Sequence, residues 1–231
     1  MPLADENRHQ PLKIYPQETL MKNQHIEKTP LAVDGVHLSC EHGLHIYLVD
    51  GTLVRNTLDS DFVSGSGHVF RFIPKSEIWV DASIPMEEVH FLVENECVLA
   101  EASRRGESID KACSRAQRAE KTSRRSEKVT APRNWKASTG EQCEHGDEIF
   151  IVNGTHVRDK WDTIFIQGGH KLRYGFVPEG EIWIEASLPE DERRFVIAHE
   201  CYELEKMRGG WDYDRAHNAA KRMENKLRRA R

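Results

Sequence analysis

The sequence predicts an α+β protein made of a tandem duplication, in which each copy is a small antiparallel sheet followed by a helical hairpin. The main observation is an internal repeat. Segment 77–102 matches segment 181–206 at a shift of 104, with eleven of twenty-six positions identical. The second observation is the order within each copy, where short apolar runs come first and helical periodicity comes last. A chain of 231 residues therefore holds two domains of about ninety residues each.

The repeat divides the chain into four parts. Residues 1–37 are polar and lack sustained periodicity, which predicts a flexible N-terminal arm. Residues 38–126 form the first copy, and residues 142–231 form the second. Residues 127–141, which separate them, are predicted to be a linker because the stretch around them is rich in Ser, Thr, Lys and Arg.

The sheet of each copy is expected to begin with a β-hairpin. An apolar run is followed by Asp50-Gly51 in the first copy and by Asn153-Gly154 in the second. Such pairs are typical of two-residue β-turns, because both positions tolerate positive φ. A second hairpin is expected to turn at Gly67-His68 and at Gly168-Gly169-His170, which assigns His170 a turn role. The Glu-Ile-Trp strand of each copy follows.

Two helices complete the second copy. Ser187 is the expected N-cap of a helix that runs to about Arg208 and stops at Gly209-Gly210. The last helix is expected to begin at Asp212 or Asp214, because apolar side chains then recur at three- and four-residue steps. The short loop between the two helices predicts antiparallel packing.

Composition limits the classes of protein that the chain can belong to. No apolar run approaches the roughly 20 residues of a membrane helix, and no secretory signal is recognisable at the N-terminus. Five cysteines without a close pair favour reduced thiols and a cytoplasmic location. The net charge is −5, yet segments 104–136 and 215–231 are basic. We interpret them as solvated helix faces, and nucleic-acid binding through them is the less favoured alternative.

The two copies differ at positions that could bind a metal ion. Three potential ligands of the second copy face non-ligands or a lone thiol in the first: His199 faces Asn95, Glu203 faces Leu99 and His217 faces Cys113. Glu200 faces Glu96, so one acid is kept in both. This pattern predicts one working site and one retired site. Glu224 faces Glu120, so a structural role is favoured for it over a role as partner of a ligand.

Helix geometry predicts that the three potential ligands converge. His199 and Glu203 are four residues apart and share a helix face. At 1.5 Å per residue, Glu203 and His217 lie at similar heights on either side of the turn. Two imidazoles and one carboxylate leave a position open for water, as in catalytic zinc sites. Glu200 can then accept a proton from that water. Tyr213 could stabilise an oxyanion, although stacking in the core is the favoured interpretation.

The segment 181–220 resembles a zincin-type metallopeptidase, in which H-E-x-x-H lies on a helix. In the gluzincin branch of that family a Glu on a following helix is the third ligand. Here the order is His199-Glu200-x-x-Glu203 and then His217, so the second His and the later Glu are exchanged. The resemblance implies that Glu200 is the general base. It also implies that the strand containing Ile182, Trp183 and Ile184 binds an extended substrate.

The sequence thus predicts a metal-dependent hydrolase, a zinc peptidase acting on a peptide or protein, with a degenerate first copy. The alternative is a non-enzymatic tandem interaction module, with or without a structural cation. Two His and one carboxylate could also hold ferrous iron. That use is less favoured, because such sites usually lie in β-barrels.

Overall fold

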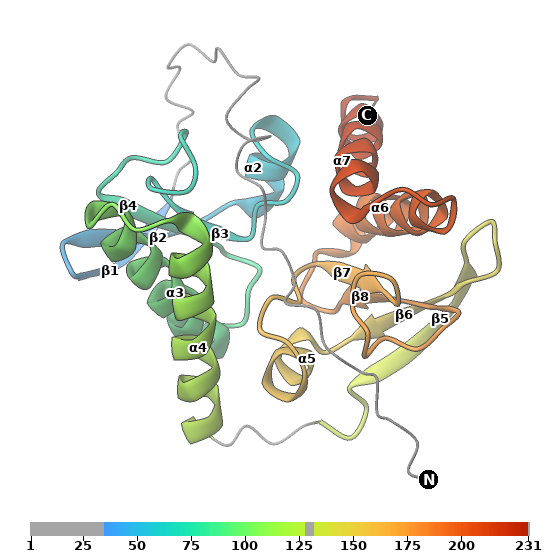
Figure 1. The fold of residues 1–231 in the computed structure, drawn as a ribbon, viewed down its shortest axis with the longest axis horizontal. Coiled ribbons are helices and arrows are strands. Elements are labelled where there is room, and N and C mark those ends of the chain that lie inside the picture. Colours follow the sequence, from blue (N-terminus) through green and yellow to red (C-terminus); the bar gives the residue numbers. More distant parts are fainter. Residues whose placement is uncertain (1–34, 128–131, 231) are drawn as a thin grey trace, which may run out of the picture.

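The computed structural model describes residues 35–127 and 132–230, and it confirms the predicted α+β duplication of a sheet followed by a helical hairpin. Residues 1–34 of the predicted arm lie outside the described residues. The two copies lie side by side in Figure 1. The elements of the first copy are β1 (Val36–Glu41), β2 (Leu44–Val49), α2 (Gly51–Thr57), β3 (Ser64–Ser66), β4 (Glu77–Asp81), α3 (Met86–Arg104) and α4 (Ile109–Glu127).

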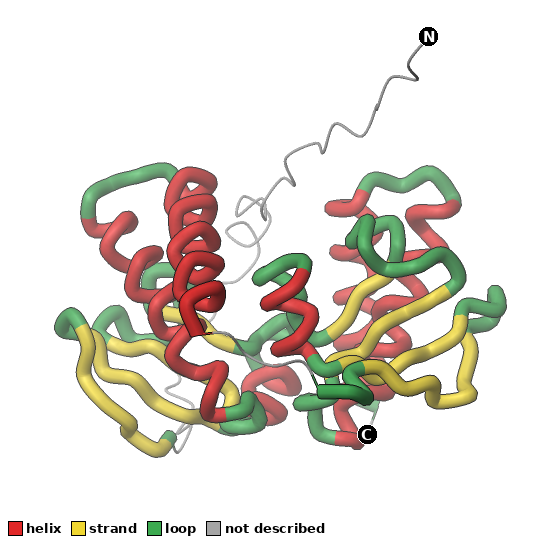
Figure 2. Tube along the Cα trace, turned by 90° about the horizontal axis from the view of Figure 1, so that it is seen from below, coloured by secondary structure: helices red, strands yellow, loops and turns green. Residues whose placement is uncertain are grey.

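The second copy repeats this order. Its elements are β5 (Lys136–Gln142), β6 (Glu148–Val152), α5 (Gly154–Lys160), β7 (Gly168–His170), β8 (Glu181–Glu185), α6 (Glu190–Arg208) and α7 (Tyr213–Arg229). Strand β5 occupies part of the predicted linker, and β1 begins within the predicted arm. Figure 2 shows the strands gathered into two separate sheets, each with its own helices.

Both sheets are mixed, whereas the sequence predicted antiparallel ones. The strand orders are β1-β2-β4-β3 and β5-β6-β8-β7. The two outer pairs of each sheet are antiparallel, and the central pairs β2–β4 and β6–β8 are parallel. Parallel neighbours need a crossover connection. That connection contains a short helix, α2 in the first copy and α5 in the second.

The first predicted hairpin is wrong because Asp50 and Asn153 cap helices. The Asp50 carboxylate accepts a hydrogen bond from the Leu53 amide at 2.9 Å, and the Asn153 side chain accepts one from the His156 amide at 2.8 Å. Asx side chains favour both turns and helix N-caps, so the local sequence did not separate the two outcomes. Gly154 follows the cap because a Cβ there would collide with the Glu185 carboxylate.

The second predicted hairpin is also wrong for the second copy, since residues 168–170 form strand β7. This strand pairs antiparallel with β8, and His170 lies opposite Ile182. The equivalent first-copy pair is Ser66 opposite Ile78. His170 therefore corresponds to Ser66, and the sequence comparison had aligned it with His68.

The helical hairpin of the second copy lies close to its predicted bounds. Helix α6 ends at Arg208, but its N-cap is Pro189, without a side-chain hydrogen bond. Ser187 bonds to Glu185 instead. Asp212 caps α7 by accepting a hydrogen bond from the Arg215 amide at 2.9 Å. Helix α6 packs on α7 and against β7 and β8, which places its inner face over the edge of the sheet.

Two buried arginines join the copies in a reciprocal arrangement. The Arg55 Nε of α2 donates to Glu192 of the second copy at 2.8 Å. The equivalent Arg158 Nε of α5 donates to Glu88 of the first copy at 2.7 Å. Each acid accepts from a further arginine of its own copy, Arg228 for Glu192 and Arg124 for Glu88. We call Arg55 and Arg158 the interface arginines. Paired and hydrogen-bonded in this way, the buried charges are compensated.

The cysteines differ from the reduced set that the sequence predicted. Cys143 and Cys201 form a disulfide with a Cα–Cα distance of 5.8 Å. Cys97 and Cys113 are free thiols of the first copy. Within the described ranges, no helix has the length and apolar character needed to cross a membrane.

Candidate metal centre

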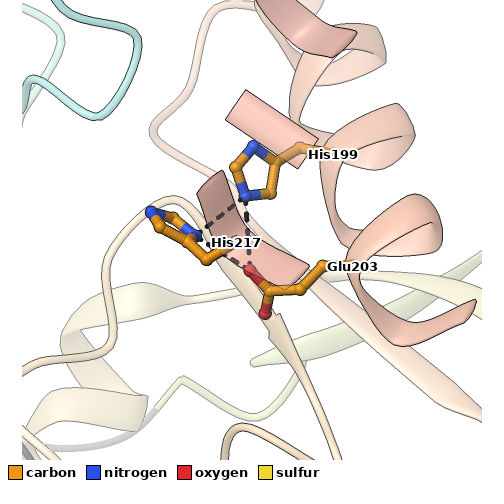
Figure 3. A group of neighbouring side chains, drawn as sticks. All are labelled: His199, Glu203 and His217. Atoms are coloured by element: carbon orange, nitrogen blue, oxygen red, sulfur yellow. Dashed lines mark hydrogen bonds and ion pairs between the residues drawn. The ribbon is translucent and has the colours of Figure 1, made fainter. Parts of the chain in front are cut away.

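Three side chains of the second copy converge between α6 and α7, as Figure 3 shows. His199 and Glu203 come from α6, and His217 comes from α7. The Glu203 Oε2 atom lies 2.8 Å from His217 Nδ1 and 3.5 Å from His199 Nε2. The two ring nitrogens are 3.1 Å apart. We call these three residues the ligand trio. The structure thus brings together the residues for which the sequence predicted convergence.

Each member of the ligand trio is held by a partner on its far side. The His199 Nδ1 atom lies 2.8 Å from Glu224, and the Glu203 Oε1 atom lies 3.1 Å from His170 Nε2. The far nitrogen of His217, Nε2, lies 3.3 Å from Asp61 of the first copy. Metal-binding imidazoles usually donate their second N–H to a carboxylate or carbonyl, which fixes the ring and its tautomer. The three outer partners are thus arranged as the imidazoles and carboxylate of a metal site would need.

His170 is the residue of this site that the sequence analysis missed. Its side chain is fully buried, and its Nε2 faces Glu203 Oε1 at 3.1 Å and Glu200 Oε2 at 4.0 Å. His170, Glu200 and Glu203 form a second group of potential ligands. Because the hydrogen bond to Glu203 is direct, we interpret His170 as the partner that fixes this carboxylate. Aligning it with Ser66 would have revealed a further histidine that the first copy lacks.

Glu200 borders the site without belonging to the ligand trio. It lines the same cavity and is 9% exposed. Burial raises the pKa of Glu200, and the negative charge of Glu203 raises it further. A carboxylate with a raised pKa accepts a proton more readily than an ordinary glutamate. Its position and protonation chemistry both suit a general base.

The charges of the centre's own side chains balance locally. Burial opposes the charged forms of the two imidazoles, but the surrounding carboxylates outweigh it. Hydrogen bonds from Glu203 and Glu224 hold the pKa of His199 well above its usual value. Asp61 and Glu203 raise the pKa of His217 to about 9. The three histidines in turn hold the pKa of Glu203 well below its usual range, against the effect of burial. A cation bound here would replace the charge of protons on the two imidazoles.

The cavity beside the ligand trio is small. It has a volume of about 60 Å³ and is also lined by Gln167, Val196 and Tyr213. The Tyr213 ring stacks on His217 at a centroid distance of 5.3 Å, and the guanidinium carbon of Arg173 lies 4.1 Å from the Tyr213 centroid. Tyr213 thus stacks as the sequence favoured, but it is half-buried at the cavity wall and does not lie in the core. The space suits an ion with a few waters, whereas pockets for drug-sized ligands measure several hundred Å³.

The predicted substrate strand is wrong. Strand β8 lies inside its sheet between β6 and β7, and Ile182, Trp183 and Ile184 are at most 2% exposed. These three side chains form core contacts and have no free surface for a ligand. The edge strand beside the centre is β7, which the sequence analysis had interpreted as a turn.

The equivalent region of the first copy has no group of potential metal ligands among its described residues. Asn95 replaces His199 and donates to Glu120 at 3.0 Å, which keeps the hydrogen bond to the counterpart of Glu224. Leu99 and Cys113 pack in an apolar cluster with alanines. The retained Glu96 is buried, and one of its oxygens has no hydrogen-bond partner in the part of the chain that the structure describes.

No protein-family model, no curated protein sequence and no solved structure matches the chain. The resemblance to zincins therefore depends on the residues of segment 181–220 alone.

Proposed function

We propose that the chain is a metal-dependent hydrolase whose second copy binds a zinc ion through His199, Glu203 and His217. The observation that carries this proposal is the complete set of outer partners, one for each member of the ligand trio. Two nitrogens and one oxygen are the donors of many catalytic zinc sites. Ordinary salt bridges among these three residues would not need a second partner at His199 Nδ1, Glu203 Oε1 and His217 Nε2.

The protein groups around the centre suit hydrolysis. A bound zinc ion supplies a Lewis acid and lowers the pKa of water at its open position. Glu200 would accept a proton from the attacking water and deliver it to the leaving group, a role that its raised pKa favours. Tyr213 keeps the His217 ring in place by stacking.

We propose a peptide or protein as substrate because the order His199-Glu200-x-x-Glu203 resembles the helix motif of zincin metallopeptidases. Strand β7 is the outer strand of its sheet by strand order, but its three residues are buried, so it offers a peptide no free edge for pairing. The small cavity beside the centre would receive only the scissile bond of such a substrate.

Metal content tests the proposed centre directly. We expect elemental analysis to find one equivalent of zinc in the wild-type protein and none in His199→Ala or His217→Ala. Cys113→Ala is the matched control, because Cys113 occupies the position of His217 in the first copy. Two equivalents would assign a second ion to the group formed by His170, Glu200 and Glu203. A wild-type protein that takes up no zinc would refute the proposal.

The role of Glu200 is tested separately by Glu200→Gln. This variant should retain zinc and lose peptide hydrolysis by a factor of about 10² or more, because the general base is gone. Turnover equal to that of the wild type would exclude Glu200 as the base.

A structural cation in a non-enzymatic module is the second candidate function, and the 60 Å³ cavity is the observation that favours it. In that case the fourth position is closed to exogenous ligands. Azide added to the Co²⁺-loaded protein should change the visible spectrum of a hydrolase with an open position, and it should leave that of a closed structural site unchanged.

Nucleic-acid binding is not favoured by the basic helices. Arg124 and Arg228 of these helices are at most 5% exposed and pair with buried glutamates between the copies. Lys221 is paired with Asp59 and Asp61. These cations are therefore engaged within the protein.

A further inference from the structure

We propose that the first copy completes the metal centre of the second, with Asp61 as the positioning residue of the His217 ligand. This inference rests on the proposed zinc centre. It assigns the first copy a direct part in that centre, where the sequence had left its role open.

Asp61 reaches the centre from the loop between α2 and β3. Its Oδ2 atom lies 3.3 Å from His217 Nε2, and the residue lines the cavity together with His199, Glu200 and Glu203. Among the partners that hold the ligand trio, Glu224 and His170 belong to the second copy and Asp61 belongs to the first. The outer set of partners is therefore incomplete without the first copy.

The contact determines which ring nitrogen of His217 can bind a cation. A carboxylate at Nε2 accepts a proton from that nitrogen, so the lone pair of a neutral ring lies on Nδ1. Nδ1 is the atom that faces Glu203 at 2.8 Å and His199 at 3.1 Å. Asp61 thus selects the tautomer that the centre needs.

Lys221 holds the acidic loop in place. Its ammonium lies 2.6 Å from Asp59 and 2.7 Å from Asp61. A carboxylate oxygen can accept more than one hydrogen bond, so Asp61 Oδ2 can accept from the imidazole N–H even though Lys221 also binds it.

The loop of the first copy contacts the helices of the second through Asp61, and the equivalent loop of the second copy has no acid at this position. In the first copy the Asp61 amide bonds to Asp59, and in the second the Ile164 amide bonds to Asp162, so Ile164 corresponds to Asp61. The counterparts of His217 and Lys221 are Cys113 and Gln117. The acid, the imidazole and the ammonium are thus present together on one side and replaced together on the other. A contact without a role in the centre has no reason to be lost in this concerted way.

Zinc affinity of the full-length Asp61→Asn variant tests the proposal. Replacing outer partners typically costs 10- to 100-fold in metal affinity, and we expect a loss of that size in a competition titration with a chromophoric chelator. Asp59→Asn is the matched control, because Asp59 contacts Lys221 at a similar distance and makes no contact with His217 among the interactions described. Its affinity should stay within about threefold of wild type.

The ring of His217 gives a second readout that is independent of variant stability. In the zinc-loaded wild-type protein, ¹⁵N chemical shifts should show Nε2 protonated and Nδ1 bound to the ion. Coordination through Nε2, or equal zinc affinity of Asp61→Asn and wild type, would overturn the inference while leaving the zinc centre intact. A wild-type protein that binds no zinc would instead refute the proposed function on which the inference depends.

Discussion

The two copies keep the same contacts with each other and differ in the space between their long helices. Arg55 and Arg158 occupy equivalent positions, and each reaches a buried glutamate of the other copy. Between the helices, by contrast, Glu203 contacts three histidines, whereas its counterpart Leu99 packs against alanines. The joint between the copies therefore depends on both halves equally, whereas the three candidate ligands all belong to the second copy.

The interface between the copies and the candidate metal site therefore constrain the sequence differently. A reciprocal interface fails if either side changes, because a buried charge loses its partner. A metal site that exists twice can lose one member, provided that the vacated space is filled. Leu99 and Cys113 fill it with apolar packing, and Asn95 keeps a hydrogen bond to Glu120. Glu96, the counterpart of Glu200, is the acid that both copies keep.

Replacing either interface arginine should give the largest loss of stability. Arg158→Met leaves the Glu185 carboxylate without its arginine partner, and Arg55→Met does the same to Asp81. We expect each to lower the free energy of unfolding by about 3–5 kcal/mol in urea titrations. The exposed pair of Arg105 and Glu101 provides the control, and Arg105→Met should cost less than about 1 kcal/mol. A large effect at one interface arginine and none at the other would show that the joint is not equivalent in its two halves.

Removing the disulfide should distinguish the second copy from the first. The bond between Cys143 and Cys201 spans a sequence separation of 58, for which chain entropy predicts a stabilisation of up to about 4 kcal/mol. Cys201→Ser should therefore lower the thermal midpoint of the oxidised protein and change little under reducing conditions. Cys97→Ser, the equivalent change in the first copy, should have little effect in either buffer. Equal midpoints for both variants in the oxidised state would contradict the assignment.

Glu96→Gln should show the smallest effect, and only at high pH. Burial raises the pKa of Glu96 to about 7 from 4.5. Between these values the folded protein retains a proton that the unfolded chain releases, so stability falls as the pH rises through this window. The variant has no such carboxyl group, so its free energy of unfolding should not fall in this way. The difference in free energy of unfolding between variant and wild type should therefore be up to about 3 kcal/mol more favourable to the variant at pH 8 than at pH 5.

Chemical denaturation of both proteins at the two pH values, with a chelator present, measures this change. Glu101→Gln at an exposed position should show no such dependence on pH. If the difference in free energy of unfolding between Glu96→Gln and wild type is the same at pH 5 and pH 8, the pKa of Glu96 is not raised.

The sequence was sufficient to predict the duplication and the convergence of His199, Glu203 and His217. The Glu-Ile-Trp repeat sets the alignment, and the alignment reveals that His199, Glu203 and His217 are changed together in the first copy. Two regular helices joined by a short loop then bring the trio together, because helix rise is constant. These inferences use local geometry, which a single sequence carries well.

The remaining features depend on contacts between distant segments. Asp50-Gly51 is equally compatible with a β-turn and with a helix N-cap. It forms a helix cap here because β2 pairs in parallel with β4, which requires a crossover connection. His170 was misaligned because a Gly-His dipeptide occurs in both copies, at 67–68 and at 169–170, whereas strand pairing makes Ser66 the equivalent of His170. Asp61 approaches His217 from 156 residues away, so no spacing rule could find it. The order of strands likewise decides that β8 is covered and β7 is at the edge.

The crossed pairing of the interface arginines has a consequence for the origin of the chain. A surface on which residue i of one half meets residue j of the other, and j meets i, is isologous, as in a two-fold homodimer. An ancestor consisting of one such half would have assembled as a pair. If its loop also carried the acid now found at Asp61, each subunit would have completed the ion site of its neighbour. Fusion of the two halves would then allow one site to lapse, while the loop beside the remaining candidate site would be kept.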